Sequence, residues 1–441
     1  MVSFTEGSFA NTVQNSVIRN SRRRPGSDSH CIVISKGKYT RITNNEIYDC
    51  TDGIQIYNGS TEEQRNDPTW SPEGTIIENN EFYLTPALYA DCSNSDPDGS
   101  LDPDGKCACA ENAIDIKITT RKPDPAPEDI TRIRNNLMYG YRKTHPTCGG
   151  SGSWGEALCT HYDYVSHILF ENNVILDSAE GLILIDASYS TIRNNLIYGI
   201  NDYGAGQGGT ASLFYSSGNN EVYNNTVIGL GGTDTYLVHR SNSINHDIRN
   251  NLFINAGKSE SESSKDAGFN SSNLVGYNGF FATEPYTNVL AESTNIIGPT
   301  VESAHLGGKY CYTKHKFTDP RSECIEKVIP LAASPLIDKG DQQVGLRNDI
   351  GIDNSIGIQT DLTGKSRDEA PDVGAFEYFT ETDHCQPLGD IDCDTKVNTF
   401  DFGYLVKYWG LSSYPTANLD DIGVVDKEDA LTFLGNYGKN N

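Results

Sequence analysis

Seven segments of the chain share one design, in which alternating apolar residues lead into an Asn-Asn pair and a second alternating strand follows. They read TRITNNEIYDC, TIIENNEFYLT, TRIRNNLMYGY, ILFENNVILDS, STIRNNLIYGI, NEVYNNTVIGL and HDIRNNLFINA. The pairs Asn172-Asn173 and Asn194-Asn195 are separated by about one turn of a β-solenoid, in which each coil buries its apolar face on its neighbours. Asparagine at each corner tolerates left-handed backbone angles and can hydrogen-bond to the asparagine of the next coil. The pattern therefore predicts a solenoid.

Composition supports an all-β chain, because glycine is abundant, methionine is almost absent, and Tyr, Ile and Asn recur. A β-propeller or a sandwich is the alternative, but the Asn-Asn period is too regular and too short for either. The segments resemble the repeats of right-handed parallel β-helix proteins, the fold of pectate lyases and many other polysaccharide-degrading enzymes. The resemblance covers roughly residues 4–298 and implies a β-helix over residues 1–298. The same fold carries hydrolases, epimerases and noncatalytic surface proteins, so it leaves the chemistry open.

Charge and cysteine content bound the location and the partners. The formal net charge of -26 argues against binding to nucleic acid or to anionic membranes, and no apolar run is long enough to span a bilayer. Eleven cysteines favour an oxidising compartment, with Cys311 and Cys324 as the expected disulfide. Four more are expected to staple an irregular region, and lack the histidine or second close pair of a zinc site: Cys92, Cys107, Cys109 and Cys148. The first residues do not read as a signal peptide. We expect a secreted protein whose export signal, with some leading coils, lies outside this sequence.

One strand of each coil can be aligned by its inward apolar residues. The inward column is Ile32, Ile54, Ile114, Leu158, Leu182, Leu213 and Leu237. Because side chains alternate along a strand, two outward columns follow. The first is Val33, Gln55, Asp115, Cys159, Ile183, Phe214 and Val238; the second is Ser35, Tyr57, Lys117, His161, Ile185, Ser216 and Arg240. Successive coils lie about 4.8 Å apart, so Asp115, Lys117 and His161 are predicted neighbours, with Tyr57 on the other side of Lys117.

The longest insertions lie beside this polar cluster. The stretch GYRKTHPTCGGSGSWGEALCTHYDY has glycines that suit a binding loop and supplies Arg142, Lys143, His145, Trp154, Glu156, His161 and Asp163. With Tyr57, Asp115 and Arg240, these residues predict a cleft for a charged sugar polymer, since aromatic rings stack on sugars and cations hold uronate carboxylates. The alternative is that Asp115 and Lys117 form an exposed, solvated salt bridge of little consequence.

A uronate lyase would remove the C5 proton and expel the 4-linked oxygen, which requires a neutralised carboxylate and a positioned base. We expect Lys117 as the base, His161 as base or acid partner, and Arg142 on the substrate carboxylate. Oxygen ligands for calcium are expected from Glu111, Asp115, Glu156 and Asp163. The pectate lyase calcium spacing has no clear counterpart here. The alternatives are a glycoside hydrolase using Asp115 and Glu156, and a noncatalytic glycan-binding or adhesive β-helix.

The segments SPLIDKGDQQVG and PDVGAFEYF resemble the closing part of many secreted bacterial β-helix proteins. Residues 299–379 are therefore expected to cap the open end of the solenoid, and residues 380–387 to form a linker.

The C-terminal stretch GDIDCDTKVNTFDFGYLVKYWG has the oxygen spacing of an EF-hand-like calcium loop followed by an apolar helix. Its ligands fall at loop positions 1, 3, 5, 7, 9 and 12: Asp390, Asp392, Asp394, Lys396 through its carbonyl, Asn398 and Asp401. A second copy offers Asn418, Asp420, Asp426 and Asp429, with Ile422 at the fifth position. The two copies resemble a dockerin-type module over residues 388–441. This resemblance implies bound Ca²⁺ and a cohesin-bearing scaffold or cell-surface partner; a purely structural calcium module is the alternative.

Overall fold

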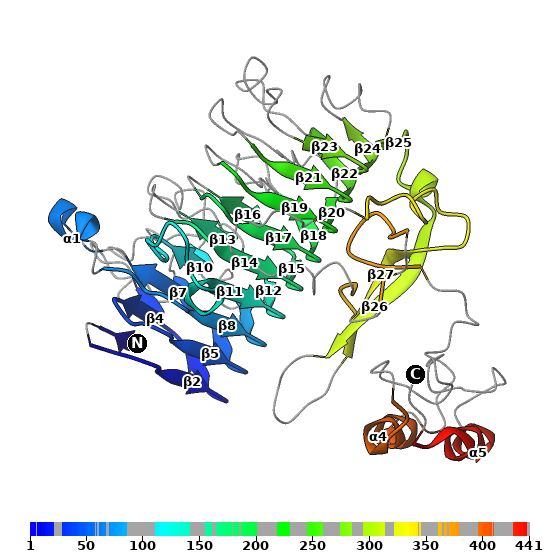
Figure 1. The fold of residues 1–441 in the computed structure, drawn as a ribbon, viewed down its shortest axis with the longest axis horizontal. Coiled ribbons are helices and arrows are strands. Elements are labelled where there is room, and N and C mark those ends of the chain that lie inside the picture. Colours follow the sequence, from blue (N-terminus) through cyan, green and yellow to red (C-terminus); the bar gives the residue numbers. More distant parts are fainter. Residues whose placement is uncertain are drawn as a thin grey trace, which may run out of the picture. The chain divides into compact units, whose positions relative to one another are not determined.

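The computed structural model describes residues 1–5, 7–21, 29–57, 59, 61–67, 70–85, 111–141, 155–160, 165–178, 180–184, 187–200, 218–229, 245–258, 274–284, 294–313, 322–342, 344, 360–363, 366–367, 370–378, 396–407, 409 and 427–438. The chain divides into two compact units, residues 1–377 and 378–441. The first unit is the predicted right-handed parallel β-helix, with three long parallel sheets that follow one another around each coil (Figure 1).

The strands of each sheet are short and pair in parallel from coil to coil. Sheet 1 contains β1 (Val2–Phe4), β4 (His30–Ser35), β7 (Asp52–Tyr57), β10 (Asn112–Ile116), β13 (Glu156–Thr160) and β16 (Glu180–Leu184). Sheet 2 contains β2 (Thr12–Gln14), β5 (Arg41–Thr43), β8 (Ile76–Glu78), β11 (Thr131–Arg134), β14 (Ile168–Glu171), β17 (Thr191–Arg193), β19 (Glu221–Tyr223), β21 (Asp247–Arg249) and β23 (Leu274–Gly276).

Sheet 3 contains β3 (Val17–Arg19), β6 (Glu46–Tyr48), β9 (Glu81–Tyr83), β12 (Leu137–Tyr139), β15 (Val174–Leu176), β18 (Leu196–Ile200), β20 (Thr226–Gly229), β22 (Leu252–Lys258), β24 (Gly279–Glu284) and β25 (Ile296–Gly298). Short helix α1 (Glu62–Asn66) follows β7. The second unit contains α4 (Thr399–Lys407) and α5 (Lys427–Asn436).

The two asparagines of each pair have different structural roles. The first adopts the left-handed conformation, with φ between 52° and 58° in every copy. The second is buried and donates its Nδ2 to the Oδ1 of the asparagine in the next coil at 2.9 to 3.1 Å. The ladder runs through Asn45, Asn80, Asn136, Asn173, Asn195, Asn225, Asn251 and Asn278. The predicted corner geometry is confirmed, and Asn278 extends it beyond the Asn-Asn repeats.

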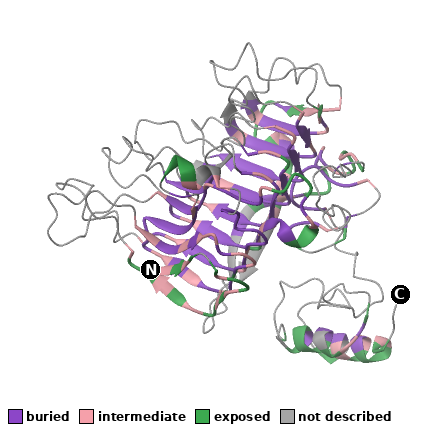
Figure 2. Cartoon of the chain, turned by 60° about the vertical axis from the view of Figure 1, so that its left-hand side comes forward, coloured by how far each residue is buried: buried purple, intermediate pink, exposed green. Residues whose placement is uncertain are grey.

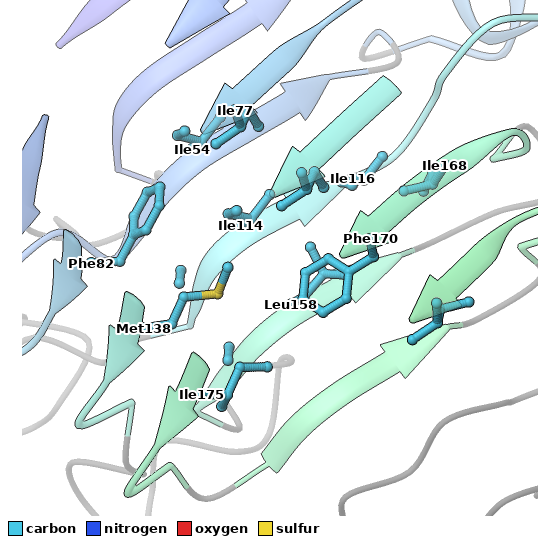
Figure 3. Close-up of a cluster of buried hydrophobic side chains, with 14 of the residues drawn as sticks. Ile54, Ile77, Phe82, Ile114, Ile116, Met138, Leu158, Ile168, Phe170 and Ile175 are labelled. Carbon is cyan, nitrogen blue, oxygen red and sulfur yellow. The ribbon is translucent and has the colours of Figure 1, made fainter. Parts of the chain in front are cut away.

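The core of the β-helix lies between the three sheets. Figure 3 shows isoleucines of sheet 1 packed toward Phe82, Met138 and Phe170 of the other two sheets. These side chains are fully buried, and Figure 2 shows most of the strand residues of the central coils as buried. Stacking removes each inward apolar column from water, which is the main stabilising contribution of the coil.

The segment expected to cap the end of the solenoid packs along the outer face of sheet 3. It includes the hairpin of β26 (Leu306–Thr313) and β27 (Ser322–Pro330). Its apolar residues form a second core with the outward side chains of sheet 3: Leu137, Val174, Leu196, Ile228, Leu252 and Phe281 against Ile325, Val328, Leu336, Val373 and Phe376. Ala375 N also donates to Thr226 Oγ1 at 2.8 Å. The placement follows from the apolar outer face of these later strands, which requires cover.

Candidate functional site

The register predicted for sheet 1 is confirmed wherever its strands are described. Ile32, Ile54, Ile114, Leu158 and Leu182 are paired in sequence across the strands. The outward column Val33, Gln55, Asp115, Cys159 and Ile183 is paired in the same way. Lys117 follows β10, and its N–H donates to the carbonyl of Ile56 at 2.9 Å, which places Lys117 in the coil beside Tyr57.

A third outward column, at the start of the same strands, was missed by the sequence reasoning. Asp52, Asn112 and Glu156 occupy it. Gly53, which follows Asp52, faces the core, since a Cβ at this position would lie 2.9 Å from Phe82 Cδ1. Ala113 and Ala157 occupy the same position in the next two strands and belong to the core. The next residues, such as Ile114, are also in the core, so the strict alternation breaks there. Asp52, Asn112 and Glu156, which precede these small residues, are therefore directed outward.

Two linked groups of polar contacts occupy these columns. Gln55 Nε2 donates to Asp115 Oδ2 at 3.0 Å, and Lys117 Nζ lies 3.2 Å from the same oxygen. In the neighbouring column, His30 Nδ1 lies 2.7 Å from Asp52 Oδ2. His30 carried no signal in the sequence beyond being a single histidine at the start of a strand.

These contacts of His30, Asp52, Gln55, Asp115 and Lys117 form a polar cluster. The cluster is buried, whereas the alternative of a solvated salt bridge assumed exposure. Asp52, Asp115 and Glu156 are 0%, 1% and 5% exposed, and the Lys117 side chain is 19% exposed. A buried carboxylate needs a partner, because removing one member of a buried pair leaves an uncompensated charge. The contact between Asp115 and Lys117 is therefore not a surface salt bridge.

The charges within the cluster act on one another. Burial alone would lower the pKa of Lys117, but the charge and hydrogen bond of Asp115, with the charges of Asp52 and Glu111, raise that pKa above its ordinary value. Burial raises the pKa of Asp52, the hydrogen bond with His30 opposes this rise, and the charge of Asp115 adds to it. Lys117 is therefore a cation at neutral pH in the free protein, whereas a general base needs a pKa near the working pH.

Several predicted site residues lie outside the described residues: Arg142, Lys143, His145, Trp154, His161, Asp163 and Arg240. Of the expected calcium ligands in this region, Glu111, Asp115 and Glu156 are described. Within the described ranges, no group of three or more His, Cys, Asp or Glu residues is placed to hold a metal ion. These three carboxylates do not by themselves fit a calcium site.

The structure contains a disulfide that the sequence reasoning did not propose. Cys31 and Cys50 are bonded and buried in the core beside the start of sheet 1. The expected partners Cys311 and Cys324 face each other across β26 and β27 in backbone register, and their side chains lie outside what is described. Cys92, Cys107, Cys109 and Cys148 also lie outside the described residues.

In the second unit, the described part of the predicted calcium loops consists of Lys396, Asn398, Asp401 and Asp429. Asp401 and Asp429 occupy equivalent places near the starts of α4 and α5, and both are fully buried. The N–H of Asn398 donates to Asp401 Oδ2 at 2.8 Å. The other predicted ligands, Asp390, Asp392, Asp394, Asn418, Asp420 and Asp426, lie outside the described residues. Two equivalent buried carboxylates fit a duplicated oxygen-ligand site.

None of the helices in the described ranges has the length and apolar character that crossing a bilayer requires.

Comparison with known proteins gives distant similarities. Residues 150–288, which contain the coils from β13 to β24, match the family described as periplasmic copper-binding protein (NosD). No curated protein matches.

Among solved structures, pectate lyase Pel9A is similar at 12% identity and a TM-score of 0.43, covering 86% of this chain and 75% of that one. A complex of XylC with xylose has 12% identity and a TM-score of 0.45, with coverage of 85% and 66%. The PL6 family alginate lyase AlyGC has 10% identity and a TM-score of 0.29, with coverage of 88% and 56%.

Proposed function

We propose that this protein is a secreted enzyme that cleaves an acidic, uronate-containing polysaccharide by β-elimination. The supporting observation is the buried, charged cluster on the outer face of sheet 1, where Lys117 and Asp115 pair beside Asp52. Burying charge in this way is costly for stability, and such clusters with perturbed pKa values are typical of functional sites. The Cys31–Cys50 disulfide supports an oxidising location outside the cytoplasm.

β-Elimination at a uronate needs a base for the C5 proton and positive charge at the carboxylate. The base takes the proton, the C5–H electrons form the C4–C5 double bond, and the C4–O bond breaks with protonation of the leaving oxygen. Because Lys117 is held protonated, it is suited to neutralise the carboxylate as charge develops on it. His161 is then the candidate base, and Arg142 a second cation.

The sequence led us to expect Lys117 as the base. For that role, substrate binding would have to remove the effect of Asp115, which raises the pKa of Lys117. Substitution distinguishes the two roles. Lys117→Arg keeps the positive charge but cannot act as a base near neutral pH. We therefore expect Lys117→Arg to retain much of the turnover, whereas near-complete loss would assign the base role to Lys117.

A glycoside hydrolase is the second candidate, because the pKa of Asp52 is raised by burial as a general acid requires. Its partner would be Asp115 or Glu156. Asp52 and Asp115 lie in adjacent strands three positions apart in register, which places their backbones about 11 Å from each other by strand geometry. Side chains directed toward each other would reach the carboxyl separation of an inverting hydrolase, about 6.5 to 9.5 Å.

Product analysis on a panel of polyuronates, mixed acidic polysaccharides and neutral glycans separates the candidates. A lyase gives an unsaturated uronate that absorbs in the ultraviolet. A hydrolase gives new reducing ends without that absorbance. Binding without either product would assign the protein to the noncatalytic glycan-binding class and contradict both enzymatic proposals.

For the second unit we propose a dockerin-like role, with calcium held by the predicted loop residues and docking to a cohesin-bearing partner. Several large apolar side chains on and after its helices are exposed: Phe402, Val406, Trp409, Leu431 and Leu434. A surface of this kind suits protein docking. The test is calcium-dependent capture of a cohesin by the full chain, with a chain ending at residue 377 as the control; equal capture by both chains would contradict the assignment.

A further inference from the structure

A hollow of about 690 Å³ lies at the ends of the first strands of sheet 1. Its lining includes Thr5 and Ser35, at the ends of β1 and β4, together with residues of α1 and of the stretch after it. The residues that matter for its chemistry are Lys36, Glu63, Asp67 and Trp70. The sequence reasoning gave this region no function.

One outward column of sheet 1 leads from the hollow to the candidate site. Ser35 pairs with Tyr57, and Lys117 follows in the next coil. Trp70 Nε1 donates to the carbonyl of Tyr57 at 2.9 Å, and the two rings meet edge to face at 6.4 Å. Two strand spacings, about 10 Å, separate the coil of Ser35 from that of Lys117. A polymer lying across the strands of sheet 1 would therefore reach both places.

The charges in the hollow favour an uncharged ligand. Lys36 Nζ lies 3.4 Å from Asp67 Oδ2 and 4.7 Å from the centre of the Trp70 ring, so its charge already has an acidic and an aromatic partner. Glu63 adds a further acid, and it is exposed. The acids outnumber the single cation, so a uronate carboxylate would be repelled. Trp70 is 9% exposed and packs with the core, so it offers the hollow a limited apolar surface. This surface, combined with carboxylate, ammonium and hydroxyl groups, suits a hydroxyl-rich neutral sugar.

We propose that this hollow is a subsite for a neutral sugar unit of the polysaccharide, about two coils from the reacting uronate. The inference rests on the proposed function and narrows it. The substrate class is a mixed polysaccharide in which neutral sugars accompany uronates, rather than a polymer of uronate alone.

Binding at Trp70 can be measured without catalysis. The chain has three tryptophans, so Trp154→Phe and Trp409→Phe leave Trp70 as the only indole reporter. Neutral oligosaccharides, tested as xylo-, manno- and galacto-oligomers, should change its fluorescence in a saturable way. Oligogalacturonate and oligoalginate should bind at least about fivefold more weakly at low salt, a difference that shrinks as salt is added.

A charge-neutralised variant tests the cause of this preference. Glu63→Gln with Asp67→Asn should tighten oligouronate binding by about fivefold or more, because two repelling charges are removed. Glu62→Gln is the matched control, since Glu62 is a neighbouring exposed acid of α1 that does not line the hollow, and it should change nothing.

The outcomes separate this inference from the proposed function. Two results would overturn the subsite even if the protein proves to be a lyase. One is no response of Trp70 to any neutral oligomer. The other is that the reporter chain with Glu63 and Asp67 intact binds oligouronates more tightly than neutral oligomers. A saturable neutral-sugar response would support the subsite even if no unsaturated product is formed, in which case the proposed lyase activity alone fails.

Discussion

At the scale of single residues, the main result is that the polar residues of sheet 1 are buried as well as aligned. The period of two was enough to predict that Asp115 and Lys117 share a face and lie in a coil adjacent to that of Tyr57. Burial could not be predicted, because it depends on what covers the outer face. Asp52 was missed because two consecutive core residues, Gly53 and Ile54, break the alternation that the prediction assumed.

Asp52 gives a prediction for the pH dependence of stability. Its folded-state pKa is raised, so the folded state binds the proton more tightly than the unfolded state does. Its contribution to stability is therefore present below about pH 4 and is lost as pH rises through the folded pKa. Asp52→Asn should remove this loss, so the free energy of unfolding should fall less as pH rises above about 4 than in the unsubstituted protein.

Urea unfolding at several pH values measures the effect. Asp129→Asn is a control of opposite sign: burial of Asp129 opposes the shift, but hydrogen bonds from Lys122, Tyr39 and Ala126 lower its pKa. Its contribution is present above about pH 4 and lost as pH falls through the lowered pKa, so Asp129→Asn should be destabilised mainly at the higher pH values. An Asp52→Asn difference with the same sign as Asp129→Asn would contradict the assignment.

At the scale of elements, the Asn-Asn pairs determine how each coil turns and stacks. The sequence predicted both roles, left-handed backbone and hydrogen bonding between coils, but not their division between the first and second asparagine. The left-handed position is occupied by other residues where the pair is incomplete, as at Tyr277 before Asn278. The structural repeat therefore includes coils that have no Asn-Asn pair in the sequence.

The division of roles predicts unequal effects of substitution within one pair. Asn173→Ala removes donors to the carbonyls of Ile133 and Glu171 and the acceptor for the N–H of Asn136. Leaving these buried groups unpaired should cost roughly 2 to 5 kcal/mol of unfolding free energy. Asn172→Ala affects the left-handed position, φ 55°, and should cost about 1 to 2 kcal/mol. Denaturant midpoints of the two variants provide the comparison, and equal losses would contradict the division.

At the scale of the whole molecule, the β-helix was predictable because stacking repeats a pattern many times. The packing of the segment after residue 298 against the side of the β-helix was not predictable. It depends on the apolar outer face of sheet 3, whose strands resemble core strands in sequence. The candidate site was predicted in part, because insertions between coils have no period from which a position could be inferred.

The second unit is expected to need calcium for its fold, because the acids of its predicted calcium loops would repel one another without a cation. Adding calcium to the metal-free full chain should increase helical circular dichroism, and a chain ending at residue 377 should show no change. Asp401→Asn should weaken the response. Identical spectra of the full chain with calcium and with chelator would count against the assignment.

The central claim, that the cluster around Lys117 carries the chemistry, is tested most directly by turnover on the substrate that the product screen identifies. Lys117→Ala should lower turnover by about two to three orders of magnitude, with Lys122→Ala as the control because Lys122 pairs with Asp129 and Glu73 outside the cluster. Since Lys117→Ala leaves Asp115 as an unpaired buried charge, Lys117→Ala with Asp115→Asn should restore stability without restoring turnover. Full turnover in either Lys117→Ala variant would contradict the account.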